Sequence, residues 1–531
     1  MIFGELKETI RKDSRLQLLL LASVIVQVIM CITAIGIYHP DQHFQLIEFS
    51  SAQLHKPFGY VWEFDAHIRP SLQVYIFSGY RILCGWLGVN NPFLQMTILQ
   101  LLFGLALFVL FNSLALWYLR QEDRRILYWV LFILNFSWWI PYTRTLFSSE
   151  MLSSLLFFGV VFWYALKSGP GRADVVGVTG AGAAAVAATG SGVARADGIV
   201  SRWLIPLFTG FIFSLSFYAR FQTAFAILGF GCWMLFFERK YYKLLPMIVG
   251  FIIGTALNIE LDHGFYHQWI FTPYTYYKVN ILEGKAAGFG TSPFIVYITE
   301  LMGITFAPPI SILLLYFGFR AAILKKLSNP LSLAVIFFIV GHCIVAHKED
   351  RFLFPVLSVL PIFIGWGLPD LIRWYQTRKE GFRKWIKGIA VFSITLNLIV
   401  LVLLFFTPYC QALHFAWQLR RHFKNEPVTI YTVPRSPLET DAHLPFVYYQ
   451  EGVRNFTWKT VKTADSMRYF SDKATYFATS YNDIKKNKQL PDSLGYERQF
   501  YSSRILWGVN TMLQSMGINT INDVWVLYKK K

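Results

Sequence analysis

The sequence predicts an all-α polytopic membrane protein with about eleven transmembrane helices and a small α/β soluble domain at the C-terminal end. Three observations predict this class. Hydrophobic residues make up 55% of the 531 residues and charged residues 15%, whereas a soluble domain carries about 25% charge. Long apolar runs recur through residues 1–408, and basic residues cluster on one side of these runs.

Eleven apolar runs approach the roughly 20 residues that a helix needs to cross the hydrocarbon of a bilayer. They lie at 16–38, 93–119, 126–140, 147–166, 203–219, 221–237, 244–260, 294–319, 331–346, 352–370 and 386–407. The first run follows four basic residues and has no small-residue cleavage site, so we predict a retained span and not a signal peptide.

The net charge of +18 raises nucleic acid as a partner, but the distribution of the 49 basic residues gives another explanation. With a cytoplasmic N-terminus, 23 of them fall in cytoplasmic segments and nine in outer loops, while 17 follow residue 408. Such an excess orients membrane proteins, so no nucleic-acid partner is predicted. The odd number of spans places the tail in the periplasm of a bacterium or the lumen of the endoplasmic reticulum.

The predicted transmembrane domain covers residues 1–408 and has two long outer loops, 39–92 and 261–293. The segment 167–202 is rich in alanine and glycine, which predicts a flexible cytoplasmic insertion. The outer soluble domain covers 409–531, with strands predicted at 428–433, 446–449, 474–480 and 524–528 and a helix at 504–517.

The first outer loop opens with His39-Pro40-Asp41-Gln42 directly after the first span. Glu63, Asp65 and Arg69 follow in the same loop. A carboxylate held at the end of a membrane helix can act as a general base on a hydroxyl group. The alternative is an ordinary solvated loop.

A second charged cluster, His347-Lys348-Glu349-Asp350-Arg351, lies between two apolar runs. Ionisable residues in such a position are costly unless they pair or bind something. Lysine and arginine at the membrane edge suit a lipid phosphate. The alternative is a short turn whose charges pair with one another.

Arg144, Glu150 and Arg220 are single charges near the outer ends of predicted spans. Arg220 stands in an almost uninterrupted apolar stretch, so we expect its guanidinium group to face the protein interior or an aqueous cavity. It either pairs with Glu150 or contacts a ligand.

The second outer loop contains Asp262, Tyr266, Trp269 and Asn280. Aromatic and amide side chains are typical of sugar contacts, although an aromatic belt at the membrane interface gives the same pattern. All these groups fall on one face under a topology derived from basic residues alone, which indicates one outward-facing site. The sequence contains no Walker loop, no GxGxxG after a strand, no HExxH and no GxSxG, so we expect an activated donor carried in the lipid.

The motif HPDQHFQ at 39–45 resembles the HPDE-type motif of the dolichyl-phosphate-mannose-dependent α-mannosyltransferases, glycosyltransferase family 22 of the GT-C fold. The resemblance continues in order through Trp62-Glu63-Phe64, TRTLFSSE at 143–150, Arg220, the 262–280 loop, GFGTSP at 288–293 and HKEDRFLFP at 347–355, and it covers roughly residues 15–370. Within the family the sequence is most similar to enzymes that add the third mannose of the glycosylphosphatidylinositol anchor.

Two features depart from the family pattern. Gln42 stands where the family usually has a second acid, which leaves Asp41 as the matching carboxylate. The family's usual lumenal tail is not recognisable in 409–531, and the compact loops look bacterial, where a polyprenyl-phosphate sugar replaces the dolichyl form. We therefore expect a bacterial cytoplasmic membrane with a periplasmic site, or alternatively an endoplasmic reticulum membrane with a lumenal one.

The resulting hypothesis is an inverting glycosyltransferase that forms an α-mannoside on a glycolipid or lipid-linked glycan, with a polyprenyl- or dolichyl-phosphate-mannose donor, membrane lipids as surroundings, and no metal or cofactor. Asp41 is the predicted base, and the predicted donor-phosphate residues are His347, Lys348, Arg351 and Arg220. The predicted acceptor- or sugar-binding residues are Gln42, Glu63, Asp65, Arg69, Arg144, Glu150, Asp262, Tyr266, Trp269 and Asn280.

Two other classes share parts of this pattern. A transporter or flippase of a lipid-linked glycan is also polytopic and has intramembrane charges, but it often shows two repeated halves, and the sequence shows no internal repeat. An assembly subunit that kept the fold and lost the activity is compatible with the departure at Gln42.

Overall fold

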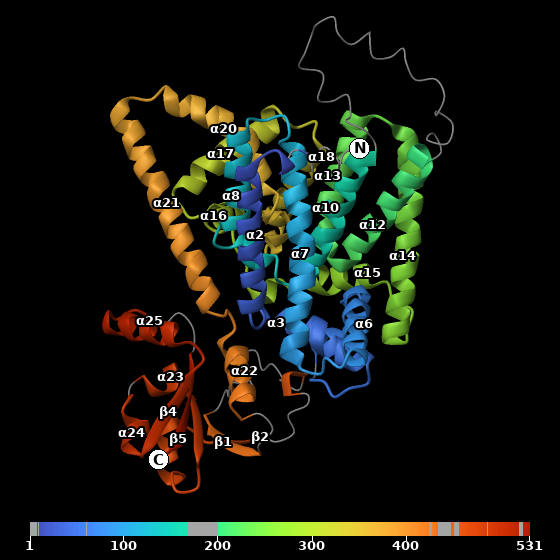
Figure 1. Cartoon of the computed structure of the whole chain (residues 1–531). Helices are drawn as coiled ribbons and strands as arrows, with labels where there is room; N and C mark the ends of the chain where they lie inside the picture. Colours follow the sequence, from blue (N-terminus) through green and yellow to red (C-terminus); the bar gives the residue numbers. More distant parts are fainter. Residues whose placement is uncertain are drawn as a thin grey trace, which may run out of the picture. The chain divides into compact units, whose positions relative to one another are not determined.

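The computed structural model describes residues 8, 10–59, 61–167, 200–423, 427–433, 448–450, 456–485, 487–519 and 524–531. Within these residues the structure is mostly helical, with one sheet near the C-terminus (Figure 1). The chain divides into two compact units. Unit 1 comprises 1–27, 63–73 and 104–399, and unit 2 comprises 28–62, 74–103 and 400–531.

Seven helical segments of the described chain are long and apolar enough to cross a membrane, which makes this a multi-pass integral membrane protein. They are α2 (Ser14–Thr33), α7 (Pro92–Tyr118), α10 (Ser149–Lys167), Arg202–Ala219 with α12 (Ile205–Ala219), Phe221–Glu238 with α13 (Ala224–Trp233), Tyr241–Tyr266 with α14 (Leu244–Tyr266), and α21 (Glu380–Phe406). Two bent pairs raise the number to nine. The predicted membrane class is confirmed.

The bent pairs differ from the straight spans that the sequence predicts. One is α16 (Val296–Thr305) with α17 (Ile310–Leu324), bent by 112°, and the other is Asp350–Leu357, which contains α19 (Phe354–Leu357), with α20 (Leu360–Gln376), bent by 67°. The first break falls at Pro308-Pro309, where two residues without an N–H interrupt the helical hydrogen bonds. The predicted spans at 126–140 and 331–346 form the shorter helices α8 (Arg124–Phe136) and α18 (Pro330–Ile344).

In unit 1, α12 packs along α14, and these two helices run side by side in Figure 1. Small residues allow this close approach. A Cβ added at Gly210 would lie 1.8 Å from the Met247 carbonyl oxygen, and one at Gly250 would lie 1.9 Å from that of Leu207. Small residues at crossings let membrane helices approach at backbone distance, and van der Waals contact then holds them together.

The two predicted outer loops contain helices of their own. The first holds α3 (Pro40–Gln42), the π-helix η1 (His43–Glu48), α4 (Phe49–Gln53), α5 (Trp62–Asp65) and α6 (Leu72–Trp86). In the second, α14 extends to Tyr266 and is followed by α15 (Thr272–Tyr277), η7 (Lys278–Leu282) and the 3₁₀ turn η8 (Ala287–Phe289). The predicted insertion at 167–202 falls largely on 168–199, which lie outside the described residues.

The C-terminal part of unit 2 contains a five-stranded sheet in the order β2-β1-β3-β5-β4. The strands are β1 (Val428–Thr432), β2 (Phe456–Thr460), β3 (Tyr476–Ser480), β4 (Tyr496–Tyr501) and β5 (Trp525–Lys530). Strand β1 pairs in parallel with β2 and β3, and β5 pairs antiparallel with β3 and β4. The helices are α22 (Gln411–Phe423), α23 (Tyr481–Ile484), α24 (Leu490–Ser493) and α25 (Arg504–Ser515).

The predicted strands at 428–433, 474–480 and 524–528 and the helix at 504–517 are confirmed. The strand predicted at 446–449 is wrong, because Tyr448–Gln450 forms a 3₁₀ turn and 446–447 lie outside the described residues. The sequence did not predict β2 and β4. Both are edge strands, which bury fewer residues and therefore give a weak hydrophobic pattern.

Candidate active site

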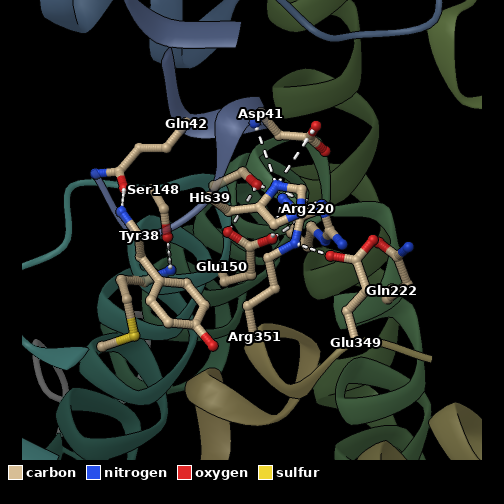
Figure 2. A network of polar contacts seen from close by, with 12 residues as sticks. Tyr38, His39, Asp41, Gln42, Ser148, Glu150, Arg220, Gln222, Glu349 and Arg351 are labelled. Atoms are coloured by element: carbon tan, nitrogen blue, oxygen red, sulfur yellow. Dashed lines mark hydrogen bonds and ion pairs between the residues drawn. The ribbon is translucent and has the colours of Figure 1, made fainter. Parts of the chain in front are cut away.

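Asp41 lies in unit 2, in the short helix α3 that opens directly after the first span. Pro40 occupies the first turn of this helix, where a residue without an N–H is tolerated. The ring Nδ1 of His39 accepts a hydrogen bond from the Asp41 backbone N–H at 3.2 Å and lies 3.6 Å from its carboxylate (Figure 2). The side chain of Asp41 is 25% exposed, so its carboxylate is accessible to a ligand hydroxyl group.

Gln42 follows Asp41 in α3 and is buried. Its side-chain oxygen accepts a hydrogen bond from the Tyr38 backbone N–H at 3.2 Å, as Figure 2 shows. An amide oxygen serves this bond as well as a carboxylate would. The residue that departs from the family pattern therefore has a local role in the turn that carries Asp41.

In unit 1, two arginine residues from different helices share one buried carboxylate (Figure 2). An Arg220 guanidinium nitrogen lies 3.1 Å from Glu150 Oε1, and one of Arg351 lies 3.8 Å from the same oxygen. The three side chains are 5%, 8% and 3% exposed for Arg220, Arg351 and Glu150. Both guanidinium groups also lie over the Phe352 ring, at 4.6 and 5.2 Å from its centroid.

This network joins elements that are distant in the sequence. Glu150 is in the first turn of α10, Arg220 ends α12 in extended conformation, and Arg351 is in the 3₁₀ turn Asp350–Leu353. The structure therefore brings together two of the predicted phosphate-binding residues. It gives Glu150 the pairing role with Arg220 that the sequence left open beside ligand contact.

The remaining residues of the 347–351 cluster are held by hydrogen bonds around Glu349. The Glu349 carboxylate accepts from Arg351 Nε at 2.5 Å and lies 2.9 Å from His347 Nε2. His347 Nδ1 lies 2.9 Å from the Gly290 carbonyl oxygen, so both ring nitrogens face oxygen atoms. Lys348 donates to the Val345 carbonyl oxygen at 2.5 Å.

A second polar group in unit 1 contains Arg69, whose guanidinium group binds Glu63 at 2.6 Å. The hydroxyl of Tyr266 donates to the Arg69 carbonyl oxygen at 2.7 Å. The guanidinium group of Arg69 lies 5.5 Å from the centre of the Tyr276 ring, whose hydroxyl accepts from Gln222 at 2.8 Å. Gln222 is two residues beyond Arg220, so Tyr276 and Gln222 connect the two polar groups of this unit.

Hydrogen bonds to Asp262 hold the loop that carries Arg69 in place. Its carboxylate accepts from the Ser71 backbone N–H and hydroxyl, both at 2.7 Å, and from the Thr272 hydroxyl at 2.6 Å. Asp262 is 1% exposed. Its geometry thus favours a structural role over the predicted contact with a sugar.

Arg144 is fully buried. It donates to the Asn135 side chain at 3.1 Å and the Leu134 carbonyl oxygen at 2.7 Å, which favours a structural role over the predicted ligand contact. Asp65 is exposed, and Asn280 donates to the Tyr276 carbonyl oxygen at 3.2 Å. Trp269 is 69% exposed and stacks on His263 at 4.0 Å.

Tyr276 and Tyr297 are not among the residues predicted from the sequence. The hydroxyl of Tyr297 accepts from the Glu349 backbone N–H at 2.9 Å and donates to the Glu349 carbonyl oxygen at 3.1 Å. Tyrosines in apolar or aromatic runs give no local signal, because only the fold places their hydroxyl groups. Among the described residues, the histidine, cysteine and carboxylate side chains form no group able to hold a metal ion.

These observations define the class: a multi-pass membrane protein with a buried arginine–carboxylate network and an accessible carboxylate in the segment after its first span. The chain belongs to the Alg9-like mannosyltransferase family, whose model matches residues 18–434. This confirms the family inferred from the motifs between 39 and 355.

Two relatives illustrate the similarity. GPI alpha-1,2-mannosyltransferase 3 of Bos taurus is 23% identical over 370 residues, which cover 67% of this chain and 60% of that protein. Mannosyltransferase APTG1 of Arabidopsis thaliana is 25% identical over 348 residues, covering 63% of this chain and 55% of that protein. The matched part thus spans less than two thirds of the length of either relative.

One solved structure similar to this chain is ArnT from Cupriavidus metallidurans bound to undecaprenyl phosphate. It has a TM-score of 0.45 and 11% sequence identity, and the match covers 96% of this chain and 97% of that chain.

Proposed function

We propose that this protein is an inverting glycosyltransferase that transfers mannose from a polyprenyl- or dolichyl-phosphate donor to a glycolipid or lipid-linked glycan and forms an α-mannoside. The observation that carries the proposal is the pair of buried guanidinium groups, Arg220 and Arg351, on the carboxylate of Glu150 in a chain of this family. Guanidinium groups suit phosphate oxygens because of their charge and planar donor geometry. The names of the relatives support mannose as the sugar.

In the proposed reaction, Asp41 takes the proton from the acceptor hydroxyl as its oxygen attacks the anomeric carbon of the donor. A carbon–oxygen bond forms on one face of that carbon. The bond to the phosphate oxygen breaks on the opposite face, and its electron pair leaves with the lipid phosphate. A single displacement of this kind converts a β-linked mannosyl phosphate into an α-mannoside. The leaving phosphate is a weak base and needs no proton from the protein.

The charged side chains around Arg220 and Arg351 suit a phosphate ligand. Three cationic side chains (Arg220, Arg351 and Lys348) accompany three carboxylates (Glu150, Glu349 and Asp350), and His347 lies beside them. A phosphodiester donor carries a single negative charge, and guanidinium and ammonium groups are suitable hydrogen-bond donors for its oxygens. On departure the phosphate becomes a monoester with a charge of roughly −1.5 to −2 at pH 7. Fixed donors aimed at this developing charge lower the barrier.

The proposal places the reaction on the outer face of the membrane, since the basic residues orient the segment that carries Asp41 outward. A bacterial cytoplasmic membrane is the proposed location, with the endoplasmic reticulum as the alternative. The proposed mechanism uses side chains of this chain alone and requires no metal or cofactor. Glu63, Arg69 and Tyr276 are the proposed contacts to the sugars.

The test measures transfer of radiolabelled mannose from polyprenyl-phosphate-mannose to a synthetic dimannosyl glycolipid by the full-length protein in liposomes. Asp41→Asn should reduce transfer by roughly 10²- to 10⁴-fold, as expected when a general base is lost. Asp472→Asn, an acid-to-amide change at an exposed position in the C-terminal part, should leave transfer unchanged.

Lys348→Ala should raise the KM for the donor more than the KM for the acceptor. Near-normal transfer by folded Asp41→Asn protein would overturn the assignment of the base. Movement of a lipid-linked glycan across the vesicle without formation of a glycosidic bond would overturn the proposed function in favour of a flippase.

A further inference from the structure

The segment that carries Asp41 packs against C-terminal chain within unit 2. The Tyr38 ring lies 4.7 Å from the ring of Tyr409, centroid to centroid. Two residues earlier, Gly36 has a φ of +117°, and a Cβ added there would lie 2.6 Å from Cys410 Cβ. Only glycine fits this backbone and this distance. The residues immediately before α3 therefore pack closely against residues 409–410.

A buried hydrogen bond between side chains holds the segment after Asp41. Within the π-helix η1, His43 Nε2 lies 2.6 Å from Glu48 Oε1, and both side chains are at most 2% exposed. The other carboxylate oxygen of Glu48 accepts from the Gly59 backbone N–H at 2.6 Å. The His43 ring stacks on the Tyr449 ring at 6.1 Å, so a second part of the C-terminal chain covers this pair.

Arg81 makes a third connection. Its guanidinium group donates to the Ser50 and Ser51 hydroxyls, at 2.8 and 3.0 Å, and lies 4.8 Å from the centre of the Tyr448 ring. The hydroxyl of Tyr448 donates to the Gln95 side chain at 2.9 Å. Residues 448–449 thus contact the helical run 40–53 directly through Tyr449 and indirectly through Arg81.

The contacts at 409–410 continue into the sheet. Gln411 Oε1 accepts from the Ser502 hydroxyl at 2.9 Å, and the oxygen of that hydroxyl accepts from the Trp525 backbone N–H at 3.0 Å. On the same helix, α22, Phe415 and Leu419 belong to the core of the sheet. The five-stranded sheet is therefore connected through α22 to the residues that hold the start of α3.

We propose that the C-terminal chain is a positioning element for Asp41, acting through Tyr409–Cys410 on one side of α3 and through Tyr448–Tyr449 on the other. This proposal rests on the proposed function, in which Asp41 is the base. Asp41 lies in a three-residue helix. The contacts made by the residues before and after this helix hold its backbone in position within unit 2. A displacement of about 1 Å at a catalytic group costs up to about a hundredfold in rate.

The test compares Tyr409→Leu with Tyr409→Phe in full-length protein in detergent and in liposomes. The leucine variant loses the contact between the two tilted rings of Tyr38 and Tyr409, while the phenylalanine variant keeps it. We expect Tyr409→Leu to lower kcat by about tenfold with both KM values unchanged, and Tyr409→Phe to stay within about twofold of wild type. Hydrogen–deuterium exchange of peptides covering 36–49 should rise by about two- to tenfold in Tyr409→Leu alone, the range that one aromatic pair supports.

Tyr38→Leu and the double variant Tyr38→Leu/Tyr409→Leu complete a cycle. If the two rings act through their contact with each other, kcat of the double variant is no lower than kcat of the worse single variant. Additive losses, unchanged kcat in folded Tyr409→Leu, or unchanged exchange at 36–49 would each overturn the proposal. A variant set in which Asp41→Asn keeps transfer while Tyr409→Leu loses it would overturn the base assigned under the proposed function and support the coupling of the tail to this segment.

Discussion

Changing Glu150 to glutamine removes the carboxylate that Arg220 and Arg351 share. The guanidinium nitrogens lie 3.1 and 3.8 Å from one carboxylate oxygen, and all three side chains are less than a tenth exposed. With an effective dielectric constant of about 20, the two attractions are about 5 and about 4 kcal/mol before the cost of dehydration is counted. Breaking a buried ion pair by removing one partner costs about 3–5 kcal/mol net, because the partner charges stay buried.

We therefore expect Glu150→Gln to lower the free energy of unfolding by about 3–5 kcal/mol. At roughly 2.1 cal/mol/K per residue, a chain of 531 residues shifts its unfolding midpoint by about 1 °C per kcal/mol, so the midpoint should fall by about 3–5 °C. The assay is thermal unfolding in detergent, followed by the intrinsic fluorescence of the 17 tryptophans.

The matched control is Glu380→Gln. Glu380 also loses an ion pair, with Lys384 at 2.8 Å, but both of these side chains are at least 70% exposed. An exposed pair contributes at most about 1 kcal/mol, so the midpoint should stay within about 1 °C. In the double variant Glu150→Gln/Arg220→Gln, the loss should be smaller than the sum of the two single losses by roughly 1–3 kcal/mol. Equal midpoints for Glu150→Gln and the control, or additive losses, would refute the view that the arginines depend on this carboxylate.

Two further predictions concern other parts of the chain. Asp262→Asn weakens the bonds from Ser71 and Thr272, so it should lower the free energy of unfolding by about 1.5–3 kcal/mol and increase hydrogen–deuterium exchange at residues 71–73. Unchanged exchange there would contradict the structural role of Asp262. In the C-terminal part, burial lowers the pKa of His414 below its usual value. His414 therefore binds a proton more readily in the unfolded chain than in the folded chain. The free energy of unfolding falls as the pH drops below about 6.5, the usual pKa of histidine. Unfolding midpoints at pH 5 and 7.5 should differ less in His414→Gln than in wild type, and an equal difference would exclude His414 as a source of the pH dependence.

The sequence predicted the membrane class and the family well because both depend on local patterns. Hydropathy is a property of neighbouring residues, since a span must satisfy its backbone hydrogen bonds within one helix. All eleven predicted apolar runs are helical, although two contain bends and two are short. The motifs around Asp41 and Arg351 were sufficient to identify the family because they occur in a fixed order along the chain.

The candidate site was predicted as a set of residue types but not as a set of contacts. The sequence predicted that Arg220 and Arg351 both bind the donor phosphate, yet it left the role of Glu150 open. It grouped Arg144 with Arg220 as single charges near span ends and predicted an acceptor- or sugar-binding role for Arg144, although Arg144 is fully buried and bonded to Asn135. Both arginines interrupt apolar stretches near span ends, so no local pattern separates them.

The sequence by itself determined the number and order of apolar runs, the uneven distribution of basic residues among the segments between them, and the presence of Asp41 in the segment after the first span. These follow from composition over windows of about 20 residues, which the bilayer thickness imposes. Only the tertiary structure decided which charged side chains pair and that Asp262 bonds to the loop at Ser71. It also decided that residues 409–410 and 448–449 contact the segment that contains Asp41. The reason is physical: these contacts join residues separated by 70 to several hundred positions, and such contacts depend on packing that no local pattern encodes.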